Sequence, residues 1–172
     1  MRLTNEMLLA NGRRLVFAWD ARYKCFTCTL KAGAPRIGIG HSRVAALVAL
    51  SDKLPHNREL LNLCAECGVK MALPSGRGLS FLRVADKRFR CYLVSDAGNV
   101  IESAAGDTRA NALLAVASKA YVRGANSTSP RHQRYQQGVW LEVYEMYKQT
   151  ERPAPVGSHA KLQRATDPWV VV

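Results

Sequence analysis

The feature that most restricts the fold of this chain is an internal similarity between residues 13–54 and residues 77–120. Three matches occur in the same order along the two stretches: Phe26-Thr27-Cys28-Thr29-Leu30 with Phe89-Arg90-Cys91-Tyr92-Leu93, Gly40-His41-Ser42-Arg43 with Gly106-Asp107-Thr108-Arg109, and Ala46-Leu47 with Ala112-Leu113. Self-similarity at a nearly constant spacing marks a repeated structural unit. The sequence therefore predicts that one module occurs twice.

Each stretch predicts a small antiparallel sheet followed by a helix. Alternation of apolar and polar residues is typical of half-buried strands, and the expected strands are residues 15–19, 23–31 and 36–39 in the first stretch and 79–84, 88–95 and 100–103 in the second. Ser42 and Thr108 are expected helix N-caps, because a side-chain hydroxyl accepts a hydrogen bond from a free amide of the first turn. On the second strand of the second unit, Phe89, Cys91 and Leu93 are expected to face inward while Arg88, Arg90 and Tyr92 face out.

A helix is also expected before each sheet. Asn57 is the expected cap of a helix over residues 58–67, which Gly68 ends, and residues 4–11 are the corresponding candidate in the first unit. The predicted fold class is therefore α+β, with two related αβββα-like units at residues 1–56 and 57–123.

Residues 124–172 are expected to hold a linker, a C-terminal amphipathic helix that starts at Pro130, and an extended tail. An apolar stripe on this helix comprises Val139, Trp140, Val143, Tyr144 and Tyr147. The stripe favours packing against the core. The alternative is a partner or homodimer surface formed by Trp140, Tyr144 and Tyr147, because Trp and Tyr are enriched at interfaces.

The composition favours a globular protein that interacts with polyanions. Of the 172 residues, 48% are hydrophobic, and 25 Lys and Arg against 13 Asp and Glu give a net charge of +12. No run of about 18 apolar residues occurs, so no membrane span is expected. Five cysteines, an odd number, fit a reducing compartment better than a secreted disulfide framework, which indicates a cytoplasmic protein.

The junction between the last expected strand and the helix carries a family resemblance. Gly38-Ile39-Gly40-His41-Ser42-Arg43, followed by Ala45-Ala46, resembles the glycine-serine-basic start of the second helix in double-stranded RNA-binding domains. This resemblance implies contacts with RNA phosphates from the start of that helix. The second unit, at residues 106–113, is also similar to small α/β sandwich domains of bacteriophage proteins.

Basic residues interleaved with aromatic ones form the candidate nucleic-acid-binding set. Its members are Arg13, Arg14, Arg22, Lys24, Arg36, His41, Arg43, Arg83, Lys87, Arg88, Arg90, Tyr92 and Arg109. Such a surface would bind mainly the nucleic-acid backbone, with weak sequence selectivity and strong salt dependence. The alternative interpretation is a solvated basic surface with no ligand.

Neither a metal site nor a catalytic site is expected. The pairs Cys25–Cys28 and Cys64–Cys67 invite a zinc interpretation, but the long separation between them favours buried structural cysteines. No nucleophile elbow, phosphate-binding loop or dinucleotide fingerprint is present. The sequence therefore predicts a non-catalytic, cofactor-free protein that binds nucleic acid, RNA ahead of DNA. The alternative is a phage or mobile-element inhibitor that contacts a host defence or nucleoprotein complex.

Overall fold

The computed structural model describes residues 3–31 and 33–151, which form two four-stranded antiparallel sheets and four helices of an α+β fold. In chain order the elements are β1 (Glu6–Leu8), β2 (Arg14–Asp20), β3 (Cys25–Lys31), β4 (Arg36–Gly40), α1 (Arg43–Lys53), α2 (Arg58–Glu66), β5 (Val69–Ala72), β6 (Gly78–Ala85), β7 (Arg88–Val94), β8 (Val100–Gly106), α3 (Arg109–Ala125) and α4 (Pro130–Glu151). The expected tail at residues 152–172 lies outside the described residues.

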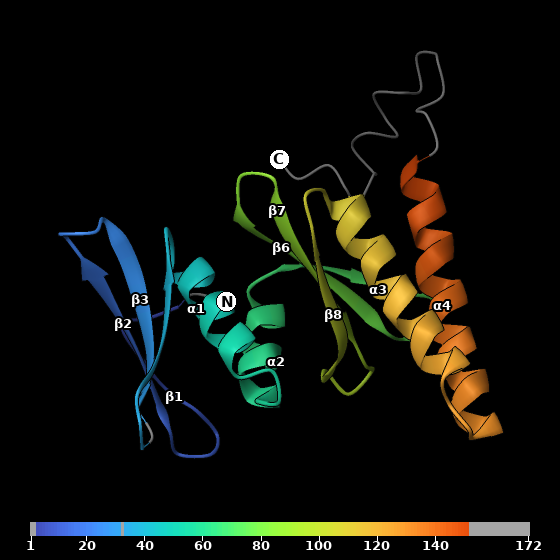
Figure 1. The fold of residues 1–172 in the computed structure, drawn as a ribbon, viewed down its shortest axis with the longest axis horizontal. Helices are drawn as coiled ribbons and strands as arrows, with labels where there is room; N and C mark the ends of the chain where they lie inside the picture. The colour runs from blue at the N-terminus through green and yellow to red at the C-terminus, as the bar shows by residue number, and fades with distance from the viewer. Residues whose placement is uncertain (1–2, 32, 152–172) are drawn as a thin grey trace, which may run out of the picture.

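The elements stack in alternating layers (Figure 1). The first sheet, in the order β1-β2-β3-β4, lies on one side of α1 and α2, and the second sheet, β5-β6-β7-β8, lies on their other side. Helix α3 covers the far face of the second sheet, and α4 packs along α3. The second sheet is therefore covered on both faces.

The two sheets share the same cross-strand pairs. Phe17 lies opposite Cys28 in the first sheet, as Phe81 lies opposite Cys91 in the second. Each sheet is followed by a helix with the expected cap, because Ser42 accepts from the amide of Ala45 at 3.0 Å and Thr108 accepts from the amide of Asn111 at 3.0 Å. The predicted strands and caps are thus present at matching places in both sheets.

The prediction of a helix over residues 4–11 is wrong. Residues 6–8 form strand β1, which pairs with β2, and Gly12 closes the turn between them with a φ of 78°. The amide of Leu9 donates to the carbonyl of Arg13 at 2.8 Å. A turn that requires left-handed glycine favours a hairpin over a continuing helix. The chain therefore starts each sheet with a strand that the sequence prediction missed, the second being β5.

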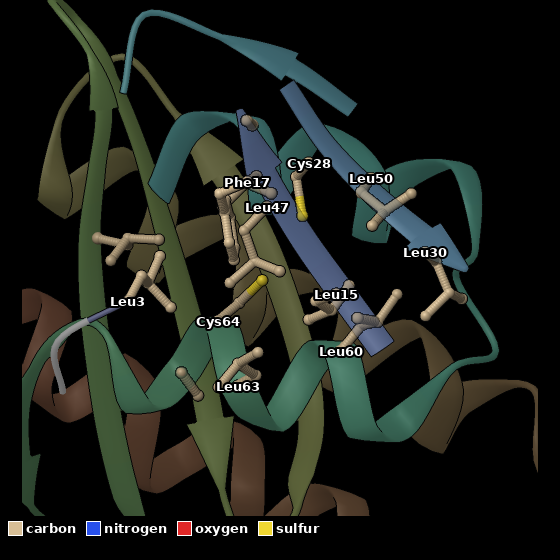
Figure 2. Close-up of a cluster of buried hydrophobic side chains, with 14 of the residues drawn as sticks. Leu3, Leu15, Phe17, Cys28, Leu30, Leu47, Leu50, Leu60, Leu63 and Cys64 are labelled. Atoms are coloured by element: carbon tan, nitrogen blue, oxygen red, sulfur yellow. The ribbon is translucent and has the colours of Figure 1, made fainter. Parts of the chain in front are cut away.

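Two apolar cores hold the layers together. The first fills the space between the first sheet and helices α1 and α2, with Leu15, Phe17, Cys28, Leu47 and Cys64 among its side chains (Figure 2). The second lies between the second sheet and α3, and α4 adds Val139 and Val143, which are fully buried. The first core also contains Leu82 and Tyr92 from the second sheet. The packing is therefore continuous across residue 57, and the predicted boundary between the two units at this residue stays a prediction.

The buried position of most cysteines matches the expectation. Cys25, Cys28, Cys64 and Cys91 are buried, and Cys67 is partly exposed. Burial raises the pKa of Cys28 to about 12 and that of Cys64 to about 11, so neither thiol forms a reactive thiolate near neutral pH. Within residues 3–31 and 33–151 no group of three or more His, Cys, Asp or Glu side chains has the geometry of a metal site.

The C-terminal helices differ slightly from the prediction. The linker expected from residue 124 begins later, because α3 continues to Ala125, and α4 starts at Pro130 as predicted. No helix among the described residues is long and apolar enough to span a membrane.

An ion pair joins α4 to the turn before β6 and gives a pH-dependent contribution to stability. Burial acts to raise the pKa of Glu142, but hydrogen bonds from Ser75 and Arg77 outweigh it and lower the pKa. The folded pKa lies below the unfolded pKa, so this stabilisation is present above the unfolded pKa, near 4.5, and is lost as the pH falls through the folded pKa. Glu142→Gln is expected to lower the free energy of unfolding by about 1–3 kcal/mol at pH 7. The difference between variant and wild type should shrink at pH 3 to 4, as measured by urea unfolding at each pH.

Candidate nucleic-acid interface

The candidate residues fall into separate groups in the fold. One group lies at the turn between β2 and β3 and at the adjacent start of α1, which we call the hairpin end. It contains Arg22, Lys24 and His41 from the predicted set and two aromatic residues, Trp19 and Tyr23. All five side chains are exposed.

Hydrogen bonds to the side chain of Asp20 fix the conformation of this turn. One carboxylate oxygen of Asp20 accepts from the backbone amides of Arg22 and Tyr23, at 2.9 and 3.2 Å. Lys24 closes the turn with a φ of 49°. The only carboxylate of the turn is thus engaged with backbone amides, which leaves the cationic charges of Arg22 and Lys24 directed to solvent.

The two aromatic side chains of the hairpin end are unusually open to solvent. Trp19 is 53% exposed and Tyr23 is 67% exposed. Trp19 meets Phe26 edge-on, with ring centroids 4.9 Å apart, and the guanidinium of Arg22 lies 5.3 Å from the centroid of the Tyr23 ring. Exposed aromatic rings beside cations are what single-stranded nucleic-acid surfaces use for stacking and phosphate contact.

The two arginines at the helix starts have internal partners. Arg43 donates to the carbonyl of Leu3 at 2.8 Å and to the side chain of Asn5, and its guanidinium lies 5.7 Å from the centroid of Phe26. Arg109 lies 5.9 Å from the centroid of Phe89. Arg43 therefore fastens the N-terminal segment to α1 in addition to contributing positive charge.

At the corresponding hairpin of the second sheet, between β6 and β7, carboxylates lie beside the cations. Arg83, Lys87 and Arg88 are exposed there, but Arg83 forms an ion pair with Asp86. Asp107 lies nearby, and a hydrogen bond from Asn111, with a further contribution from Lys87, lowers the pKa of its carboxyl group. Carboxylates thus offset part of the positive charge at this hairpin.

The expectation that Arg90 and Tyr92 face solvent is wrong. They do lie on the sheet face opposite Cys91, but helices α1 and α2 cover that face. Tyr92 is 1% exposed and hydrogen-bonds to Cys64, and Arg90 forms an ion pair with Asp52 of α1. Tyr92 is therefore inaccessible to a nucleic acid, and the guanidinium of Arg90, whose side chain is 16% exposed, is engaged with Asp52.

A second group of cations lies at the opposite end of the first sheet. Arg13 and Arg36 of the predicted set share an open pocket of about 660 Å³ with Lys53, His56 and Arg58, which are not in that set. The two ends are separated by the length of β2, about 20 Å for seven residues. Arg14 is nearby in sequence but pairs with Glu6 at 3.2 Å.

The aromatic stripe of α4 is divided between core and surface. Val139 and Val143 are buried, whereas Trp140, Tyr144 and Tyr147 are half-buried and stack in series. Tyr121 of α3 extends the series, with its ring centroid 5.5 Å from that of Trp140. Core packing accounts for the two valines, and the role of the aromatic residues in binding a partner stays a prediction.

Comparisons with protein-family models, with curated proteins and with solved structures find no match to this chain.

Proposed function

We propose that this protein binds nucleic acid without catalysing a reaction, and that the hairpin end of the first sheet carries the contact. The observation that supports this most is the combination of exposed Trp19 and Tyr23 with the cations Arg22 and Lys24 on one turn. Two rings provide stacking surfaces for bases, and the cations provide phosphate contacts. Because stacking requires unpaired bases, the preferred ligand in this proposal is single-stranded RNA, ahead of single-stranded DNA. It differs in this respect from the duplex that the resemblance to double-stranded RNA-binding domains implies.

We also infer that the two sheets arose by duplication of one module. Three turns support this inference, because a residue with positive φ stands at matching places in each sheet. The pairs are Gly12 and Gly76, Lys24 and Lys87, and Gly33 and Gly98. The basic, aromatic hairpin end would then be a feature that the first copy acquired or the second copy lost.

The test is fluorescence anisotropy with a labelled single-stranded RNA, the same DNA sequence and an RNA duplex, each at low and at physiological salt. Trp19→Ala is expected to weaken single-strand binding about tenfold, because stacking contributes about 1–3 kcal/mol per base. Tyr135→Ala, an exposed aromatic of α4, is the control and is expected to leave binding unchanged. Failure of all three ligands to bind at low salt would contradict the proposal and favour contact with a host nucleoprotein complex.

A further inference from the structure

The pocket at the other end of the first sheet has a surplus of positive charge. Its lining includes the cations Arg13, Arg36, Lys53 and Arg58 and one carboxylate, that of Glu59, so four positive charges face one negative charge. Glu59 already accepts a hydrogen bond from the amide of Ala10. Within residues 3–31 and 33–151 no carboxylate forms an ion pair with any of these four cations.

The corresponding place in the second unit can be found from the backbone. Arg13 corresponds to Arg77, since each carbonyl accepts from the amide four residues earlier at 2.8 Å. Lys53 corresponds to Lys119, since each ammonium donates to a carbonyl of the last strand of its sheet at 2.6 Å. Arg36 lies opposite Leu30 in the sheet register as Glu102 lies opposite Leu93. The matching position of Arg36 is therefore a glutamate.

In the second unit these cations are neutralised within the protein. Arg77 pairs with Glu142 at 3.0 Å, and Glu102 pairs with Lys119 at 3.8 Å and Arg123 at 3.1 Å. Glu102 is buried, with 8% of its surface exposed. Glu102 of β8 and Glu142 of α4 thus supply the anions beside the second sheet, whereas the first sheet has Arg36 at the position of Glu102. The first unit has a place for an anion from outside the chain.

The start of α2 adds to the attraction for an anion. Asn57 caps this helix by accepting from the amide of Leu60 at 3.2 Å, and residues 57–59 line the pocket. The first amides of a helix have no acceptor within the helix, and the helix dipole favours a negative charge there. Arg58 at this position is unfavourable for the helix alone, so a bound anion would relieve its repulsion from the helix dipole.

We propose that this pocket binds a phosphate monoester, carried either by a free nucleotide or by the phosphorylated end of a strand. A pocket of about 660 Å³ has room for a nucleotide. A phosphate monoester carries about −1.5 to −2 charges at pH 7, more than the single charge of an internal phosphodiester, and therefore gains more from four cations. Arginine pairs bidentately with phosphate oxygens, which suits Arg13, Arg36 and Arg58.

The decisive variant is Arg36→Glu, which gives the first unit the carboxylate that Glu102 supplies in the second. We expect it to fold with an unchanged or higher melting temperature, because Lys53 is in place to pair with the new side chain. Arg58→Ala, at an exposed position, is the second variant should Arg36→Glu not fold. Arg88→Glu on the second hairpin is the control that makes the same change in charge outside the pocket.

The probes are adenosine 5′-monophosphate, measured by calorimetry at low salt, and one RNA oligonucleotide with either a 5′-phosphate or a 5′-hydroxyl, measured by anisotropy. Binding of the mononucleotide indicates a free nucleotide as ligand, whereas a preference of tenfold or more for the 5′-phosphorylated strand without mononucleotide binding indicates a strand end. In either case Arg36→Glu or Arg58→Ala should lower the affinity at least tenfold and Arg88→Glu by less than twofold.

The pocket assignment is overturned if the mononucleotide does not bind and the two oligonucleotides bind equally, or if Arg88→Glu weakens binding as much as the pocket variants. This outcome is distinct from failure of the hairpin end, which is measured with the 5′-hydroxyl oligonucleotide and Trp19→Ala. The hairpin end can therefore bind RNA whether or not the pocket binds a phosphate monoester.

Discussion

Gly38→Ala is expected to lower the free energy of unfolding by about 3 kcal/mol or more, the upper part of the range for overpacking a core. Gly38 lies on β4 where the strand approaches α1, and a Cβ there would overlap the carbonyl oxygen of Ala46 and the amide nitrogen of Leu50. Both are backbone atoms, so no rotamer change relieves the overlap and the strand must move away from the helix. For a protein of this size the melting temperature should fall by about 6–12 °C.

Gly138→Ala is the matched control, and its effect should have the opposite sign. Gly138 lies within α4, and a Cβ added there meets no atom within 4 Å. Replacing glycine by alanine inside a helix stabilises by about 0.5–1 kcal/mol. Calorimetric melting of the two variants beside the wild type tests the contact between β4 and α1. A melting temperature for Gly38→Ala equal to that of the wild type would show that strand and helix do not approach so closely.

The second large effect is expected from reversing both cations of the hairpin end. The double variant Arg22→Glu, Lys24→Glu should bind single-stranded RNA about 100-fold more weakly at 50 mM salt, because two phosphate contacts are replaced by repulsion. Each lost contact lowers the slope of log K against log salt by about 0.7 for a single strand, so the double variant should lose about 1.4. Both side chains are exposed, so the melting temperature should stay unchanged.

Lys87→Glu, Arg88→Glu on the second hairpin is the control for this variant, because Lys87 occupies the same left-handed turn position as Lys24. Its effect on RNA affinity should be less than about fivefold, since Asp86 and Asp107 already offset charge at that turn. Equal losses from both double variants would mean that RNA responds to net charge alone and that the hairpin end is not a site.

The sequence predicted most strands and helices, but it did not predict which sheet faces the helices would cover. Alternation located β2 and β3 and their counterparts β6 and β7, because each of these strands has a buried apolar face. Capping located α1 and α3, because each begins after a hydroxyl cap. Strand β4 lacks such a face, because Ile37 and Ile39 are exposed and Gly38 is its buried residue. Strands β1 and β5 were missed since each has only three or four residues, too few for a period to appear. The burial of Arg90 and Tyr92 was also missed, because local alternation separates two sheet faces but does not tell which face another helix will cover.

For the proposed phosphate pocket, too, the sequence predicted some of the residues but not how they come together. Arg13 and Arg36 were selected as cations, but their meeting with Lys53 and Arg58 depends on how the turn between α1 and α2 folds back on the sheet. One signal was present in the sequence, namely that Arg36 and Glu102 occupy matching positions of the two similar stretches. Its meaning required the ion pairs of Glu102 with Lys119 and Arg123, which only the folded chain brings together.

The most direct test of nucleic-acid binding at the hairpin end is a heteronuclear NMR titration of the ¹⁵N-labelled protein with a short 5′-hydroxyl single-stranded RNA. We expect the largest amide shift changes at residues 19–24 and 41–43, together with a shift of the indole N–H of Trp19. Changes that are confined to the aromatic stripe of α4, or that are absent at low salt, would contradict binding at the hairpin end.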